Sequence, residues 1–316
     1  MYIMNILVIA TGGTIGSGFD GASIDVQGGC AVAERYVQEH EDVDLEVVEP
    51  LNILSESIAA DDLNTLAASI YNSDIEKYCG VIVTVGSDNL GYISSFVGLL
   101  FGSCGLPVCL VASDRVLSDP AANGYENFCC AVGLIKSGVA GAWVPYRNSD
   151  GVMYVHSATD IRQADLCDDF YSFHGAYAVW DGALRPLREP VSHTVPEVFC
   201  RKNLPVISDN VLMIHPYPLQ EYSRLRLDGV KAVLHTLYHS STLDSAGACG
   251  FIESCGVPVY LAAFRKGREL YRTAVEAISA GAVPLYDISP ECAYMKLLLA
   301  CAQDRLGIHE FMESGI

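Results

Sequence analysis

The chain has 316 residues, of which 51% are hydrophobic and 18% charged, a globular composition long enough for about two domains. Its formal net charge of −19 repels nucleic acid and anionic lipid, so neither is expected as a partner. No apolar run approaches the roughly 20 residues that a membrane-spanning helix needs.

The N-terminal residues carry no basic segment and no cleavage site, so we interpret them as the first core strand and expect a cytoplasmic location. Twelve cysteines without a secretion signal favour buried, reduced thiols over a disulfide framework. They show no paired C-x-x-C spacing, and a structural role is favoured for His235 and His239. We therefore predict neither a metal site nor a cofactor.

Alternating apolar patterns run along the first half of the chain. Predicted strands cover residues 6–10, 45–49, 81–84 and 107–112, and helical stripes cover residues 62–70 and 93–100. Strands that alternate with helices predict a parallel sheet with right-handed crossovers. The predicted fold is therefore α/β, with a doubly wound, mainly parallel sheet in a larger N-terminal domain.

Residues 187–198 contain two prolines and no clear periodicity, which is typical of a linker. We expect an N-terminal catalytic domain at residues 1–186, a linker at 187–203, and a smaller C-terminal α/β domain at 204–316. In the smaller domain the pattern predicts strands at residues 233–237 and 257–263 and helices at 270–280 and 293–306.

The first predicted strand runs into the sequence TGGTIGS, in which Gly12 and Gly13 stand between Thr11 and Thr14. Glycine permits a sharp turn and a close approach to backbone N–H groups at the carboxyl edge of an α/β sheet, where ligands bind. The stretch lacks the further glycines of a dinucleotide site and the Lys-Ser/Thr ending of a nucleotide loop.

A second strand, at residues 81–84, runs into a similar turn that presents Ser87, Asp88 and Asn89 after Gly86. An aspartate at this place is often a helix N-cap. The preceding glycine, the Ser87 hydroxyl and the parallel turn at Thr14 favour a functional role instead.

Together, TGGTI and the later TVGSD resemble the two signatures of the bacterial-type L-asparaginase family, which includes amidotransferase-type relatives. The resemblance extends over nearly the whole chain. Further similar segments are NILSE at residues 52–56, ASDRVLSDPAANGYEN at 112–127, and the stretch from Tyr271 to DISPECAYMKL at 287–297.

The resemblance implies hydrolysis of the side-chain amide of L-asparagine, or of a related amide, through a threonine acyl-enzyme. It assigns the nucleophile to Thr14 and a second catalytic hydroxyl and carboxylate to Ser87 and Asp88. Ser55 and Glu56, with Asp88, would hold the α-carboxylate and α-amino groups of the substrate. Backbone N–H groups around Gly13 and Gly86 would hold the oxyanion. The alternative for Thr14 is a hydroxyl that caps its own turn.

Two departures from the family pattern stand out. The catalytic lysine of the family is missing from residues 154–170, where Asp160 falls closest to its place and Arg162 is the nearby cation. Arginine stays protonated and cannot act as a base. We therefore expect that lysine at position 160 would restore the family's charge. The lid at residues 16–29 carries Phe19 in place of the usual tyrosine, and Tyr238 or Tyr271 could replace it only if the fold brings one of them close.

Two classes of function remain open. The first is an amidohydrolase, and the second is a divergent member that binds an amino acid or acts on a different, larger amide. The resemblance also implies a homo-oligomer, a dimer or tetramer.

Overall fold

The computed structural model describes residues 3–13, 15, 17–19, 24–26, 30–165, 168–196 and 204–315. The chain divides into two compact units, the first ending at Leu204 and also including Gly315, and the second running from Pro205 to Ser314. The division falls at the end of the predicted linker, residues 187–203. Each unit is described by itself.

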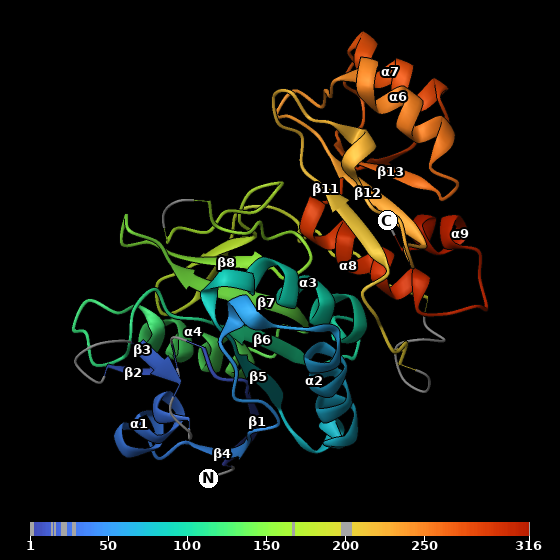
Figure 1. Ribbon diagram of the computed structural model, residues 1–316. Coiled ribbons are helices and arrows are strands. Elements are labelled where there is room, and N and C mark those ends of the chain that lie inside the picture. Colours follow the sequence, from blue (N-terminus) through green and yellow to red (C-terminus); the bar gives the residue numbers. More distant parts are fainter. Residues whose placement is uncertain are drawn as a thin grey trace. The chain divides into compact units, whose positions relative to one another are not determined.

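The first unit contains an eight-stranded sheet in the order β10-β9-β8-β7-β6-β5-β1-β4 (Figure 1). The pairs β4–β1, β1–β5, β5–β6 and β6–β7 are parallel. The pairs β7–β8, β8–β9 and β9–β10 continue the sheet and are antiparallel. The strands are β1 (Met4–Ala10), β4 (Val43–Val48), β5 (Gly80–Thr84), β6 (Pro107–Val111), β7 (Gly141–Arg147), β8 (Met153–Ser157), β9 (Ala178–Trp180) and β10 (Leu184–Pro186).

Helices cover both faces of this sheet, as the predicted doubly wound α/β fold requires. Helices α1 (Ala31–Glu39) and α4 (Gly124–Lys136) pack together, and α4 contacts β5, β6 and β7. On the other face, α2 (Ala60–Asn72) contacts α3 (Leu90–Phe101), which packs on β6 and β7. Strands β5 and β6 are buried throughout because both of their faces are covered. The α/β fold class is confirmed.

Helix α3 is more buried than its apolar stripe predicted, since only Tyr92 is not fully buried. The segment that follows β8 covers the helix. A Cβ on Gly98 would lie 2.9 Å from Thr159 Cγ2, and one on Gly91 would lie 2.8 Å from the backbone nitrogen of Gln163. The two glycines therefore let the chain from 158 to 163 lie directly along the helix.

The predicted lid contains a two-stranded antiparallel hairpin, β2 (Ser17–Phe19) with β3 (Ile24–Val26). The side chain of Phe19 lies outside the described residues, so the lid expectation stays a prediction. Short 3₁₀ helices follow three loops of this unit, η2 (Ser55–Ser57), η3 (Ile75–Lys77) and η4 (Ser87–Asn89).

The second unit has a four-stranded parallel sheet, β11 (Val211–Ile214), β12 (Ala232–Thr236), β13 (Val259–Phe264) and β14 (Val283–Tyr286), in that order. Helices α6 (Ser245–Ser254) and α7 (Arg272–Ser279) pack together. Helix α8 (Pro290–Cys301) contacts β11, β12 and β13, and packs on α9 (Ile308–Glu313). A further 3₁₀ helix, η5 (Tyr222–Arg224), contacts α6.

Helix α8 ends five residues before the predicted end at residue 306. The side-chain amide of Gln303 donates to the carbonyls of Ala300 and Leu306, 3.0 Å each, and its oxygen accepts from two backbone N–H groups beyond the helix. These bonds offer the backbone an alternative to a further helical turn.

The ten cysteines within the described residues are free thiols, but only five of them are buried and the other five are partly exposed. His235 is fully buried and bonded to the Tyr222 hydroxyl at 2.8 Å, which agrees with a structural role. Among the described helices, none is long and apolar enough to cross a membrane.

Candidate active site

The turn after β1 is fixed between the turn after β5 and the loop at residue 53. The Thr11 hydroxyl donates to the Thr84 carbonyl at 2.8 Å, and the Thr11 backbone N–H donates to the same oxygen at 3.2 Å. On the other side, Ile53 exchanges backbone hydrogen bonds of 3.1 Å with Thr11 and Gly13. Thr11 is 5% exposed, so its hydroxyl serves this junction and is not available as a nucleophile.

Three sequence motifs pack closely together at this edge of the sheet. Gly13 has a φ of +79°, and a Cβ there would lie 2.4 Å from the backbone nitrogen of Gly86. A Cβ on Gly86 would lie 2.3 Å from the Ser55 hydroxyl oxygen. These contacts explain why both positions are glycine. Thr14, the predicted nucleophile, lies outside the described residues, directly after Gly13.

The Ser55 loop and the second turn are joined by side-chain hydrogen bonds. Ser55 is 5% exposed, and its hydroxyl donates to Asp88 Oδ2 at 3.3 Å. The amide of Asn89 donates to the Ser55 carbonyl at 2.5 Å. Ser87 is half-buried, whereas Asp88 and Glu56 are exposed. The structure thus brings Gly13, Gly86, Ser55 and Asp88 together and leaves two carboxylates facing solvent beside them.

The helix-cap alternative for Asp88 is not observed. Asn89 occupies the N-cap position of α3, with no side-chain cap bond, and the Asp88 carboxylate accepts from Ser55 instead. An exposed carboxylate held by a buried hydroxyl is suited to bind an ammonium group.

Gln163, which the sequence analysis did not single out, holds the second turn from outside. Its side-chain nitrogen donates to the Ser87 carbonyl and its oxygen accepts from the Gly91 backbone N–H, both at 3.0 Å. The Gly91 N–H is one of the helix-start donors that lack a partner within the helix. No local pattern marks this glutamine, because its partners lie more than 70 residues away in sequence.

Asp160 does not reach the second turn. It is 2% exposed, and its two oxygens accept from the His174 ring nitrogen Nδ1 at 2.6 Å and the His174 backbone N–H at 3.1 Å. The expectation that lysine at position 160 would restore the family's charge is therefore wrong, because Asp160 is buried with His174 and not beside Ser87. Gln163, three residues later, is the residue of this segment that contacts the Ser87 turn.

The described lysines of the first unit also lie away from the site. Lys77 pairs with Asp74 at 2.6 Å and Lys136 with Asp42 at 2.5 Å. Each comes shortly before a strand begins, β5 and β7 respectively, at the amino edge of the sheet. Among the described residues of this unit, no lysine occupies the place that the family gives to its catalytic lysine.

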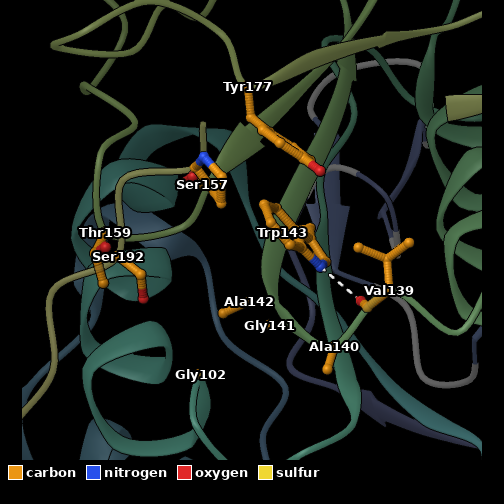
Figure 2. A pocket seen from close by; sticks show the side chains of 11 residues that line it. Gly102, Val139, Ala140, Gly141, Ala142, Trp143, Ser157, Thr159, Tyr177 and Ser192 are labelled. Atoms are coloured by element: carbon orange, nitrogen blue, oxygen red, sulfur yellow. Dashed lines mark hydrogen bonds between the residues drawn. The ribbon is translucent and has the colours of Figure 1, made fainter. Parts of the chain in front are cut away.

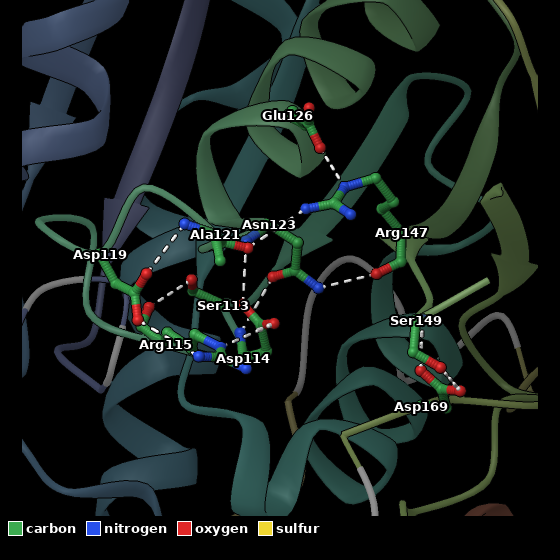
Figure 3. A network of polar contacts seen from close by, with 10 residues as sticks. All are labelled: Ser113, Asp114, Arg115, Asp119, Ala121, Asn123, Glu126, Arg147, Ser149 and Asp169. Atoms are coloured by element: carbon green, nitrogen blue, oxygen red, sulfur yellow. Dashed lines mark hydrogen bonds and ion pairs between the residues drawn. The ribbon is translucent and has the colours of Figure 1, made fainter. Parts of the chain in front are cut away.

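The loop after β6 is closed by a polar network beside the site (Figure 3). Asp114 and Asn123 exchange hydrogen bonds of 2.9 Å between backbone N–H and side-chain oxygen in both directions. Asn123 also donates to the Arg147 carbonyl at 2.8 Å, and the Arg147 guanidinium pairs with Glu126. The network ties the segment at residues 112–127 to β7.

Cys30 lies next to the site, since its thiol interacts with Thr84. Burial raises the pKa of the Cys30 thiol to about 11, and backbone and side-chain hydrogen bonds only partly oppose this shift. The thiol therefore stays protonated near neutral pH, where a cysteine nucleophile needs a thiolate.

A doubly wound sheet that joins a Thr-Gly-Gly turn, a Ser-Glu loop and a Gly-Ser-Asp turn at the carboxyl ends of its strands defines an asparaginase-type unit. The family model described as "Asparaginase, N-terminal" matches residues 5–178, more than half of the chain. The chain belongs to the asparaginase family.

Related proteins extend this result along the chain. A glutamyl-tRNA(Gln) amidotransferase subunit of Pyrococcus horikoshii is 24% identical over 323 residues, covering 94% of this chain and 72% of that protein. The protein of the same name from Thermococcus kodakarensis is 26% identical, and the match covers 93% of this chain and 70% of that protein.

Solved structures show the same fold. The thermostable L-asparaginase from Thermococcus kodakarensis has a TM-score of 0.79 at 19% identity, with 98% of this chain and 96% of that chain covered. L-asparaginase I from Vibrio cholerae has a TM-score of 0.77 at 20% identity, with 100% of this chain and 98% of that chain covered.

Proposed function

We propose that this protein is an amidohydrolase that releases ammonia from the side-chain amide of L-asparagine, or of a related amide, through an acyl-enzyme on Thr14. The observation that carries the proposal is the close packing of Gly13, Gly86 and Ser55, whose three motifs lie far apart in sequence. Family membership supports the same reaction class.

In this mechanism the Thr14 hydroxyl attacks the amide carbon, and its proton passes to the leaving nitrogen, which departs as ammonia. Backbone N–H groups of the two glycine turns hold the carbonyl oxygen as it gains negative charge. Ser87 then positions a water that attacks the acyl ester, which restores Thr14 and gives the carboxylic acid. Asp88, held by Ser55, binds the α-ammonium group and assists the proton transfers.

A second candidate is favoured by the amidotransferase names of the relatives. In that case the protein would release ammonia from glutamine for use by a partner protein that handles the larger acceptor. The formal charge of −19 opposes direct contact of this chain with RNA. Ammonia release from asparagine, glutamine and a panel of β- and γ-amides distinguishes the two candidates.

The decisive experiment is Thr14→Val, which removes the hydroxyl and keeps the shape of the side chain. Aspartate binding, measured by calorimetry, should persist, while ammonia release should fall by several orders of magnitude. Thr65→Val is the matched control, because the Thr65 hydroxyl bonds only within its own helix, to the Asp61 carbonyl at 2.8 Å. Turnover by Thr14→Val within a few-fold of wild type would exclude Thr14 as the nucleophile.

Ser87→Ala distinguishes the two half-reactions. If Ser87 acts mainly in deacylation, the variant should give a burst of ammonia followed by a slow steady rate.

We also propose a homo-oligomer, a dimer or tetramer, because the first unit places no lysine at the site among its described residues. A fully active monomer in sedimentation would contradict this.

A further inference from the structure

A cavity of about 280 Å³ opens in the first unit away from the three motifs. It lies where β7 begins at Gly141 and α3 has ended at Gly102, so it is at the amino edge of the parallel strands. The candidate active site lies at their carboxyl ends. The cavity is therefore a separate feature of the unit.

The cavity combines an aromatic wall with hydroxyl groups. The rings of Trp143 and Tyr177 stack with centroids 4.7 Å apart, and Thr159 and Ser192 lie on the other side (Figure 2). Ser157 is 5% exposed. Within the described part of the chain, the hydroxyls of Ser157, Ser192 and Tyr177 form no hydrogen bond. They are free to bind a ligand.

The lining also limits the kind of ligand. None of the described residues that line the cavity carries a charge, so a zwitterionic amino acid would leave its ammonium and carboxylate groups without partners. The volume of about 280 Å³ lies just below the roughly 300–1,000 Å³ typical of small-molecule sites. We propose that this cavity is a second ligand site, which binds a compact, uncharged ring compound that bears hydroxyl or amide groups.

The site is connected to the Ser87 turn through α3 and the segment beside it. Thr159 lines the cavity and packs against Gly98, and Gln163, four residues later, bonds to Ser87 and Gly91. Gly91 and Gly98 are two helical turns apart, about 10 Å. A ligand that shifts Thr159 therefore moves the segment that braces the Ser87 turn, and the site is regulatory.

Binding is tested with adenine and D-glucose as uncharged probes, by saturation-transfer NMR and titration of tryptophan fluorescence. At least one should bind saturably, and the double variant Ser157→Ala/Ser192→Ala should weaken it at least tenfold. Ala142→Leu, which fills the cavity, should abolish it, whereas the control Ser254→Ala in α6 should not change it. Binding of neither probe, or binding unaffected by both cavity variants, overturns the proposal.

The regulatory part has its own measurement. The bound probe should change hydrogen exchange of the Gly91 amide, which bonds to Gln163, at least threefold in wild type and not in Ala142→Leu. This readout does not depend on catalysis, so it stands or falls separately from the amidohydrolase proposal. Unchanged exchange at a saturating probe concentration overturns the regulatory role.

Discussion

Gln163 offers the sharpest test of how the second motif is held in place. Gln163→Leu keeps the volume of the side chain and removes the two hydrogen bonds that hold the second turn, one from the Gly91 N–H and one to the Ser87 carbonyl. Gln163→Glu keeps an acceptor for Gly91 and places a negative charge at a helix N-terminus, where it is favourable. A carboxylate cannot donate to Ser87, so both variants release that carbonyl.

The expected magnitudes follow from burial. Gly91 is buried, and a buried N–H without a partner costs about 1–3 kcal/mol. Ser87 is half-buried, so water can replace the lost donor at its carbonyl, and losing this hydrogen bond costs about 0.5–1.5 kcal/mol. Gln163→Leu should therefore lower the free energy of unfolding by about 2–4 kcal/mol, and Gln163→Glu by about 1 kcal/mol.

The kcat values of the variants should not follow the order of their stabilities. If Gln163 positions the Ser87 turn, both variants should lower kcat for ammonia release about 10- to 100-fold, since small displacements of catalytic groups have effects of that size. The matched control is Gln303→Leu, because Gln303 braces the end of α8 through similar bonds. It should lose comparable stability and keep its kcat.

The pattern across the three variants decides the role. A positioning role for Gln163 would be refuted if kcat simply followed stability across the variants. This would be the case if Gln163→Glu and Gln303→Leu both showed their expected stabilities and Gln163→Glu kept the wild-type kcat. Chemical denaturation and steady-state kinetics on the same preparations supply both quantities.

Three further outcomes are expected. Gly86→Ala should remove aspartate binding, because its Cβ would lie 2.3 Å from the Ser55 hydroxyl oxygen. The control Gly250→Ala, whose Cβ would have no atom within 4 Å, should keep aspartate binding and stabilise α6 by up to about 1 kcal/mol. Equal aspartate affinity of the two variants in calorimetry would contradict this. Asp160→Lys should lower the free energy of unfolding by about 3–5 kcal/mol and bring no gain in rate, because it breaks the buried pair with His174; a stable, faster variant would argue otherwise. Burial lowers the pKa of His156 from 6.5 to about 4, so the unfolded chain binds a proton here at higher pH than the folded chain does. The free energy of unfolding should therefore fall by about 3 kcal/mol as the pH drops from 6.5 to 4. His156→Phe should flatten this part of the stability profile, measured by denaturation at a series of pH values.

The sequence determined the fold class and the motif turns, because both depend on local patterns. Apolar runs between turn residues predicted β1, β5 and β6, because the residues of these strands are buried and almost all apolar. The glycines of the two turns were recognisable from their own sequence, and the structure adds the reason, which is that Gly13 and Gly86 leave no room for a Cβ.

Tertiary packing decided what no local pattern carries. Gln163 and Asp160 stand three residues apart in the same segment, yet one braces the Ser87 turn and the other is buried with His174. Their partners come from distant parts of the chain, so residue type and spacing could not separate their roles. The cavity near Gly141 likewise exists only because five segments that are separate in the sequence meet there, and no local pattern in any one of them predicts a void.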